Sequence, residues 1–70
     1  MSKKVYNRIK AVLAENGKTS NWLASELNVN ITTVSKWCRN EMQPRVDSLF
    51  SVAEALDVDV RDLLVSNKRQ

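Results

Sequence analysis

Apolar residues recur at three- and four-residue spacing along most of the chain, in short segments separated by brief polar stretches. Such spacing places apolar side chains on one face of an α-helix. With one glycine and one proline in 70 residues, the chain lacks the turn residues that a β architecture needs. A chain of this length has a small core, because folding buries only about 60% of its unfolded surface. The sequence predicts a single compact all-α domain over residues 1–70, with its core at about 4–65 and frayed termini.

The first segment with helical spacing lies at the start of the chain. Residues from about Lys4 to Glu15 place apolar side chains on one face, and Gly17 can close the helix in the left-handed conformation. The expected core face consists of Val5, Ile9, Val12 and Leu13. This pattern predicts a first amphipathic helix over about residues 4–15.

Two short helices are expected next, joined by about three residues. Thr19 is an N-cap for the first of them, and Asn28 tolerates the left-handed conformation that a tight turn after it needs. Val29 is expected as a buried anchor in the turn, and Asn30 as the N-cap of a third helix over about residues 31–39. This spacing is typical of a helix-turn-helix.

A break and two further helices complete the pattern. Asn40 suits the position after a helix end and Pro44 stops helical continuation, so a loop is expected between them. Renewed helical spacing predicts a fourth helix, and Asp59 can cap a short fifth helix. The expected core positions of these two helices are Val46, Leu49, Phe50, Ala53, Leu56, Val60, Leu63 and Leu64.

Charge is distributed unevenly along the chain. Residues 1–45 carry eight Lys or Arg against three Glu, or +5, whereas residues 46–70 carry three against five acidic residues, or −2. A basic half on a small domain is what a phosphate-binding surface requires, although ordinary solvated faces also carry such an excess.

Missing residue types argue against several classes of function. The chain has no histidine and a single cysteine, Cys38, so an internal disulfide and the usual zinc sites cannot form, and no cofactor is expected. Without histidine or clustered carboxylates among the basic residues, no catalytic constellation is visible and an enzyme is not expected. No apolar run is long enough for a signal peptide or a membrane span, which predicts a cytoplasmic protein with no membrane contact.

Three stretches form a combined signature. The run from Thr19 to Trp37 contains Leu23-Ala24 and then Val29, Pro44 follows, and the run from Leu56 to Leu64 ends in Leu63-Leu64. Together they resemble the phage-repressor and Cro type of helix-turn-helix, the XRE family, over roughly residues 5–65. The resemblance implies a compact five-helix repressor-like domain with a helix-turn-helix formed by helices two and three. It also implies that the third helix enters the DNA major groove, usually as a dimer on a near-palindromic operator.

The chain departs from the family pattern in two ways. Asn28 and Asn40 stand where the family often has glycine, and asparagine is the next residue best suited to a left-handed backbone. Leu13 and Cys38 replace an Arg and a Glu that commonly pair in the family. Because one of those charges left alone would cost roughly 3–5 kcal/mol, we expect the two replacements to form an apolar contact instead.

The third helix supplies the candidate base contacts. In the major groove, residues at its N-terminal end and one turn onward face the bases. Lys36 can donate to guanine O6 and N7, Thr32 can hydrogen-bond or touch a thymine methyl, and Ile31 can make apolar contact. The complete set is Asn30, Ile31, Thr32, Ser35 and Lys36. The alternative is an ordinary solvated helix face with Ile31 partly in the core.

Two places supply candidate phosphate contacts. The N-terminus of the second helix, at Thr19, Ser20 and Asn21, carries partial positive charge and unpaired backbone N–H groups. Arg39 and Arg45 flank the loop after the third helix and can reach the sugar-phosphate backbone. Thr19 is equally well explained as a helix cap.

The two tryptophans and the cysteine are expected to have structural roles in the core. Trp22 and Trp37 lie at helical spacing with aliphatic partners, so both are expected in the core rather than as base-stacking platforms. Cys38 has only Arg39 as a cation near it in sequence, which favours a packed thiol over a redox sensor.

The sequence therefore predicts a transcriptional regulator, expected to be a repressor, that binds double-stranded DNA as a homodimer. Apolar residues left over from the core would form the dimer seam, namely Val58, Val60, Leu64 and Val65. Two alternatives remain. One is an antitoxin-type protein that masks a toxin partner, for which Asp57, Asp59 and Asp62 offer an acidic surface. The other is a controller protein of a restriction–modification system.

Overall fold

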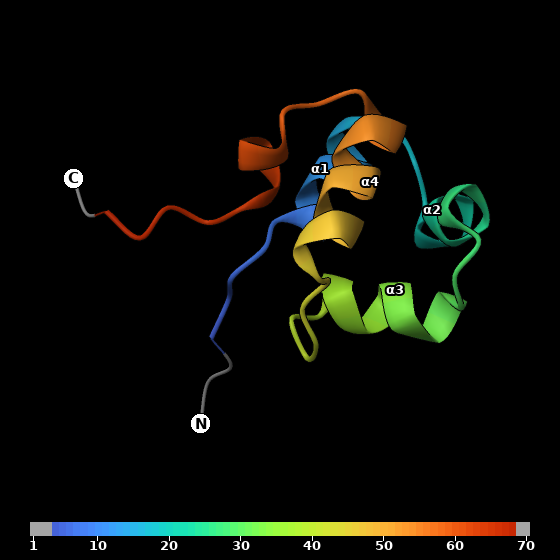
Figure 1. Cartoon of the computed structure of the whole chain (residues 1–70), viewed down its shortest axis with the longest axis horizontal. Helices are drawn as coiled ribbons and strands as arrows, with labels where there is room; N and C mark the ends of the chain where they lie inside the picture. Colours follow the sequence, from blue (N-terminus) through green and yellow to red (C-terminus); the bar gives the residue numbers. More distant parts are fainter. Residues whose placement is uncertain (1–3, 69–70) are drawn as a thin grey trace.

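Capping residues set the helix boundaries in the computed structural model, which describes residues 4–68 (Figure 1). Its elements are α1 (Ile9–Glu15), α2 (Ser20–Leu27), α3 (Ile31–Cys38), α4 (Val46–Leu56) and the 3-10 turn η1 (Val60–Leu63). Apart from one isolated β-bridge, the regular structure of the described residues is helical, which confirms the predicted all-α class.

Side-chain caps fix the two helices of the helix-turn-helix. The Trp22 backbone N–H donates to Thr19 Oγ1 at 3.0 Å, and the Thr32 N–H donates to Asn30 Oδ1 at 2.7 Å. Asn28 ends α2 in the left-handed region with φ 56°. These three predictions are confirmed, and they explain how two eight-residue helices follow one another with three residues between them.

The core lies where the helices meet. Figure 1 shows α1 and α4 at the centre of the molecule, with α3 below them and α2 to one side. The side chains with no or almost no exposure come from every element, and they are Ile9, Val12, Leu23, Val34, Val52 and Leu63. Trp37 is buried as predicted, and Trp22 packs against this core while partly exposed.

The first helix begins at Ile9, so the prediction that it begins near Lys4 is wrong. Residues 4–7 form an extended segment and Arg8 is the N-cap of the helix, whose first N–H, that of Ile9, donates to the side-chain oxygen of Asn7 at 3.0 Å. Asn7 therefore satisfies a helix N–H group that has no partner within the helix. Val5, which was expected in the core, is exposed.

The extended segment pairs with the segment that follows η1. The Arg8 N–H donates to the Leu63 carbonyl at 2.8 Å and the Val65 N–H to the Tyr6 carbonyl at 3.0 Å, on either side of an antiparallel bridge to Leu64. This pairing brings the two ends of the described chain together.

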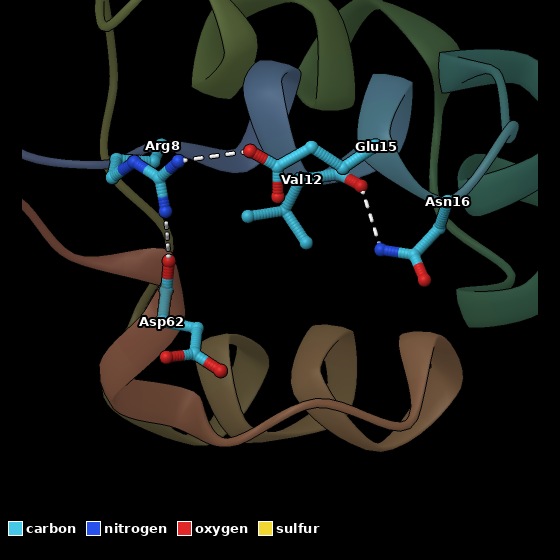
Figure 2. A network of polar contacts seen from close by, with 5 residues as sticks. All are labelled: Arg8, Val12, Glu15, Asn16 and Asp62. Carbon is cyan, nitrogen blue, oxygen red and sulfur yellow. Dashed lines mark hydrogen bonds and ion pairs between the residues drawn. The ribbon is translucent and has the colours of Figure 1, made fainter.

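Arg8 also ties the start of α1 to η1 through its side chain (Figure 2). Its guanidinium donates to the Asp62 backbone carbonyl at 3.0 Å and to the Glu15 carboxylate at 3.1 Å. At the other end of α1, the Asn16 side-chain amide donates to the Val12 carbonyl at 2.8 Å. The same carbonyl also accepts from the Asn16 backbone N–H at 3.1 Å, so the side chain of Asn16 adds a second hydrogen bond at the end of the helix.

Three further predictions about the fold are corrected by the structure. The fifth helix is only the 3-10 turn η1, because the chain extends at Leu64 to reach the β-bridge. Val29 is 37% exposed rather than buried. On α4, Phe50 is 50% exposed and Val46 more so, since the buried stripe is formed by Leu49, Val52, Ala53 and Leu56.

Candidate nucleic-acid interface

Helix α3 is held by its apolar residues and leaves a polar face exposed. Val34 and Trp37 are buried in the core, whereas Thr32 and Lys36 are exposed. Thr32 and Lys36 are four residues apart and so are neighbours on one face of the helix. Lys36 has no ion-pair partner among the described residues. The helix therefore presents one cation and one hydroxyl on a surface whose orientation the core fixes.

The remaining predicted base-contact residues lie around the same face. Ile31 is 39% exposed at the N-terminus of α3, and Ser35 is half-buried one turn onward. Asn30 is exposed, but its side-chain oxygen already accepts from the Thr32 N–H as the helix cap. Asn30 retains its side-chain NH₂ group as a donor for a base or a phosphate.

The N-terminus of α2 lies beside the C-terminal end of α3. Ser20 Oγ is 3.6 Å from Cys38 Sγ, and both side chains are half-buried. Thr19 Oγ1 accepts from the Trp22 N–H, whereas Asn21 is exposed. Of the three predicted phosphate-binding residues here, Asn21 thus presents its side chain to solvent, while the side chains of Thr19 and Ser20 have partners within the protein.

Leu13 and Cys38, which replace the Arg and Glu that commonly pair in the family, both lie in apolar surroundings. Leu13 is buried in the core, and Cys38 packs against the same core. The direct contact between their side chains stays a prediction.

The two predicted phosphate-binding arginines differ in their partners. Arg39 donates from Nε and Nη2 to the Glu41 carboxylate at 2.9 and 3.3 Å. The hydrogen bonds that Arg39 donates to the Glu41 carboxylate, together with the negative charge of that carboxylate, raise the pKa of Arg39. Arg45 is 87% exposed in its side chain and lies 3.9 Å from Asp47. Arg45 is therefore the arginine whose guanidinium can reach a phosphate without giving up a close carboxylate.

Sequence reasoning missed a network of amides that ties the extended segment to the loop after α3. Asn7 is 4% exposed, and its side-chain NH₂ donates to the Trp37 carbonyl at 3.0 Å and to Gln43 Oε1 at 2.7 Å. The Tyr6 and Asn7 N–H groups both donate to Asn40 Oδ1, at 2.9 and 3.0 Å. The partners are 30 to 36 residues apart, so local sequence carries no signal for them.

Other kinds of site find little support in residues 4–68. Within this range, no group of three or more potential metal ligands comes together. None of the helices there has the length and hydrophobicity that crossing a membrane requires. Trp22 carries the Lys18 ammonium 4.8 Å from its ring centre, a cation–π contact at the surface rather than an open stacking platform.

Comparison with known proteins places this geometry in a family. A helix-turn-helix family model matches residues 9–63. The chain is also similar to a crystal structure of a "putative DNA-binding protein" from Bacteroides fragilis, with 49% sequence identity, a TM-score of 0.83, and coverage of 84% of this chain and 95% of that one. No curated protein sequence matches the chain. The residues matched span α1 to η1, and the chain therefore belongs to the XRE family of helix-turn-helix proteins.

Proposed function

We propose that the chain is a non-enzymatic, cytoplasmic transcriptional regulator that binds double-stranded DNA in a sequence-specific manner and represses. The observation that carries the proposal is the division of α3 into a buried face at Val34 and Trp37 and an exposed face at Thr32 and Lys36. A helix held in this way can enter a major groove with its polar face toward the bases. The description of the Bacteroides fragilis protein supports the DNA-binding part of this proposal.

Base and phosphate contacts have separate places in this proposal. Thr32 and Lys36 read base edges, with Ile31 against a thymine methyl and Asn30 and Ser35 at the margins of the same face. Arg45 and the α2 N-terminus at Thr19, Ser20 and Asn21 hold phosphates and fix the position of the domain on the duplex. Arg39 can also bind a phosphate, but its guanidinium would then interact with Glu41 and the phosphate at the same time.

Selection of a site from random duplexes, followed by binding measurements, tests the proposal. The selected duplex and a scrambled duplex of equal length would be titrated at one fixed salt concentration by fluorescence anisotropy. A sequence-specific regulator is expected to bind the selected site about a thousandfold or more tightly than the scrambled one. Equal affinity for both would contradict sequence-specific binding.

A homodimer on a near-palindromic operator is the second part of the proposal. One copy offers few base contacts, and two copies related by a two-fold axis place two α3 helices about 34 Å apart on one face of the duplex. Of the four predicted seam residues, Leu64 and Val65 are exposed, whereas Val58 and Val60 are half-buried and pack against the core. Val46 and Phe50 on α4 are exposed as well, and an apolar hollow of about 240 Å³ lies between Tyr6, Pro44, Leu49 and Leu64. Exposed apolar surface of this kind is a candidate for the dimer contact.

Phe50→Glu is expected to weaken binding to the selected site by about tenfold, because a charge in an apolar contact opposes association of the two copies. Ser51→Glu adds the same charge to the next exposed position of α4 and serves as the control. Sedimentation of the complex should give two wild-type chains per site. One chain per site at saturating protein would end the dimer proposal.

A further inference from the structure

The two ends of the described chain come together beside the loop that follows α3. The antiparallel pairing of Tyr6 with Val65 and of Arg8 with Leu63 holds residues from opposite ends side by side. The Asn40 carboxamide then fixes this pair to the loop, because it accepts from the Tyr6 N–H and donates to the Asn7 carbonyl at 3.2 Å. The position of the terminal segments is therefore tied to the C-terminal end of α3.

A polar hollow of about 570 Å³ lies between these terminal segments. We call it the terminal hollow, and its lining residues are Lys4, Val5, Tyr6, Val65, Ser66, Asn67 and Lys68. Two lysines and no acidic residue are among its lining residues. Neither Lys4 nor Lys68 has an ion-pair partner among residues 4–68. Two unneutralised cations at one concave surface attract an anion.

The chemistry of the lining fits a phosphate rather than an isolated small molecule. Lys4 and Lys68 supply six N–H donors between them, and Ser66, Asn67 and Tyr6 add hydroxyl and amide groups that can donate to phosphate oxygens. Lysine acts on phosphate as a point charge, so it needs no bidentate geometry. The hollow is an open surface formed by two chain segments, so the backbone of a nucleic acid can pass over it.

Figure 1 places the extended N-terminal segment on the side of the molecule that holds α3. From its attachment beside α1, this segment runs down to the level of α3, whereas the C-terminal segment, the other wall of the terminal hollow, runs to the side away from α2. A duplex below α3 would therefore be nearer to the N-terminal wall of the hollow than to its C-terminal wall.

The geometry points to the terminal hollow as a second phosphate-binding surface for the DNA backbone, with Lys4 and Lys68 as the residues that hold it. This assignment rests on the proposed DNA binding and extends it to residues outside the helix-turn-helix. Such contacts carry no sequence information but add to affinity and position the domain. They release counterions, so each one steepens the dependence of affinity on salt by about 0.9 in a log–log plot.

The test is a salt titration of wild type, Lys4→Gln, Lys68→Gln and the double variant on a duplex containing the selected site. Each single variant is expected to flatten the slope by about 0.9 and the double variant by nearly 2. Between about 50 and 200 mM salt, the wild type should then lose about tenfold more affinity than the double variant. Lys10→Gln removes one charge from an exposed lysine of α1 that does not line the hollow, and should keep the wild-type slope. Equal thermal midpoints of unfolding would show that the variants are folded.

The outcomes separate this assignment from the proposed function. Flattened slopes in the Lys4 and Lys68 variants, with the Lys10 variant unchanged, support the terminal hollow as a phosphate site. Unchanged slopes in the double variant overturn the assignment, leave DNA binding by α3 intact, and make an acidic protein the better partner for the hollow. An equal loss in the Lys10 variant also overturns it, because the effect is then one of net charge. Failure of the wild type to bind any duplex overturns the proposed function itself.

Discussion

Replacing Asn7 with alanine is expected to lower the free energy of unfolding by about 3 kcal/mol, one of the largest effects of any polar substitution in this domain. The substitution removes the partner of Gln43 Oε1 and of the Ile9 N–H, and one of the two donors to the Trp37 carbonyl, which still accepts from the Asn40 N–H. Each such group costs about 1–3 kcal/mol when it stays buried, and less when water can reach it. In a domain of this size, about 3 kcal/mol corresponds to a fall of roughly 12–24 °C in the midpoint of thermal unfolding.

Asn16→Ala is the matched control, because it removes the same side chain from the opposite end of α1. The Asn16 amide makes one hydrogen bond, to the Val12 carbonyl, and lies at the surface, where water can replace it. Its loss is expected to cost about 0.5–1 kcal/mol. Chemical denaturation of both variants would compare them directly. If Asn7→Ala unfolds at the same denaturant concentration as Asn16→Ala, the buried amide network does not stabilise the fold.

The helix-turn-helix could be predicted from sequence because its determinants are local. Thr19 and Asn30 accept from N–H groups three and two residues onward, and Asn28 adopts the left-handed conformation without help from distant residues. The exposed face of α3 followed from the same local rules, since the burial of Val34 and Trp37 fixes which side Thr32 and Lys36 occupy.

The start of the chain could not be predicted from sequence because its determinants are distant. Val5 and Ile9 have helical spacing, yet the helix does not begin before Ile9, because Asn7 finds its partners at Trp37 and Gln43. The spacing of apolar residues within a segment gives no information about hydrogen bonds to residues 30 and 36 positions away. The terminal hollow depends on this segment, so it too was absent from the sequence analysis.

Another error arose on α4, where spacing leaves a choice. On α4, Leu49 and Phe50 are successive residues about 100° apart around the helix, and sequence alone does not decide which edge of the apolar face meets the core. The assignment of Arg39 to phosphate stays a prediction, but the ion pair between its guanidinium and Glu41, two residues onward, was not foreseen. Opposite charges at this spacing in a loop were visible in the sequence and could have indicated the ion pair.

Lys36→Ala is expected to cost about 1–3 kcal/mol on the selected site, or about five- to 150-fold in affinity, and much less on random duplex. The lysine lies on the exposed face of α3, one turn from Thr32, where its ammonium can reach guanine O6 and N7. Arg45→Ala is the comparison, because Arg45 lies just before α4 with an exposed guanidinium. It should weaken selected and random duplexes by similar factors and flatten the salt slope by about one.

One titration series with both variants, both duplexes and several salt concentrations distinguishes a residue that contacts bases from one that contacts phosphates. The two side chains are exposed, so neither substitution should change the midpoint of thermal unfolding. If Lys36→Ala weakens every duplex equally, as Arg45→Ala is expected to do, α3 does not read sequence through this residue. If both variants bind DNA as the wild type does, neither residue contributes to a DNA interface, and masking of a partner protein becomes the better account of the exposed face of α3.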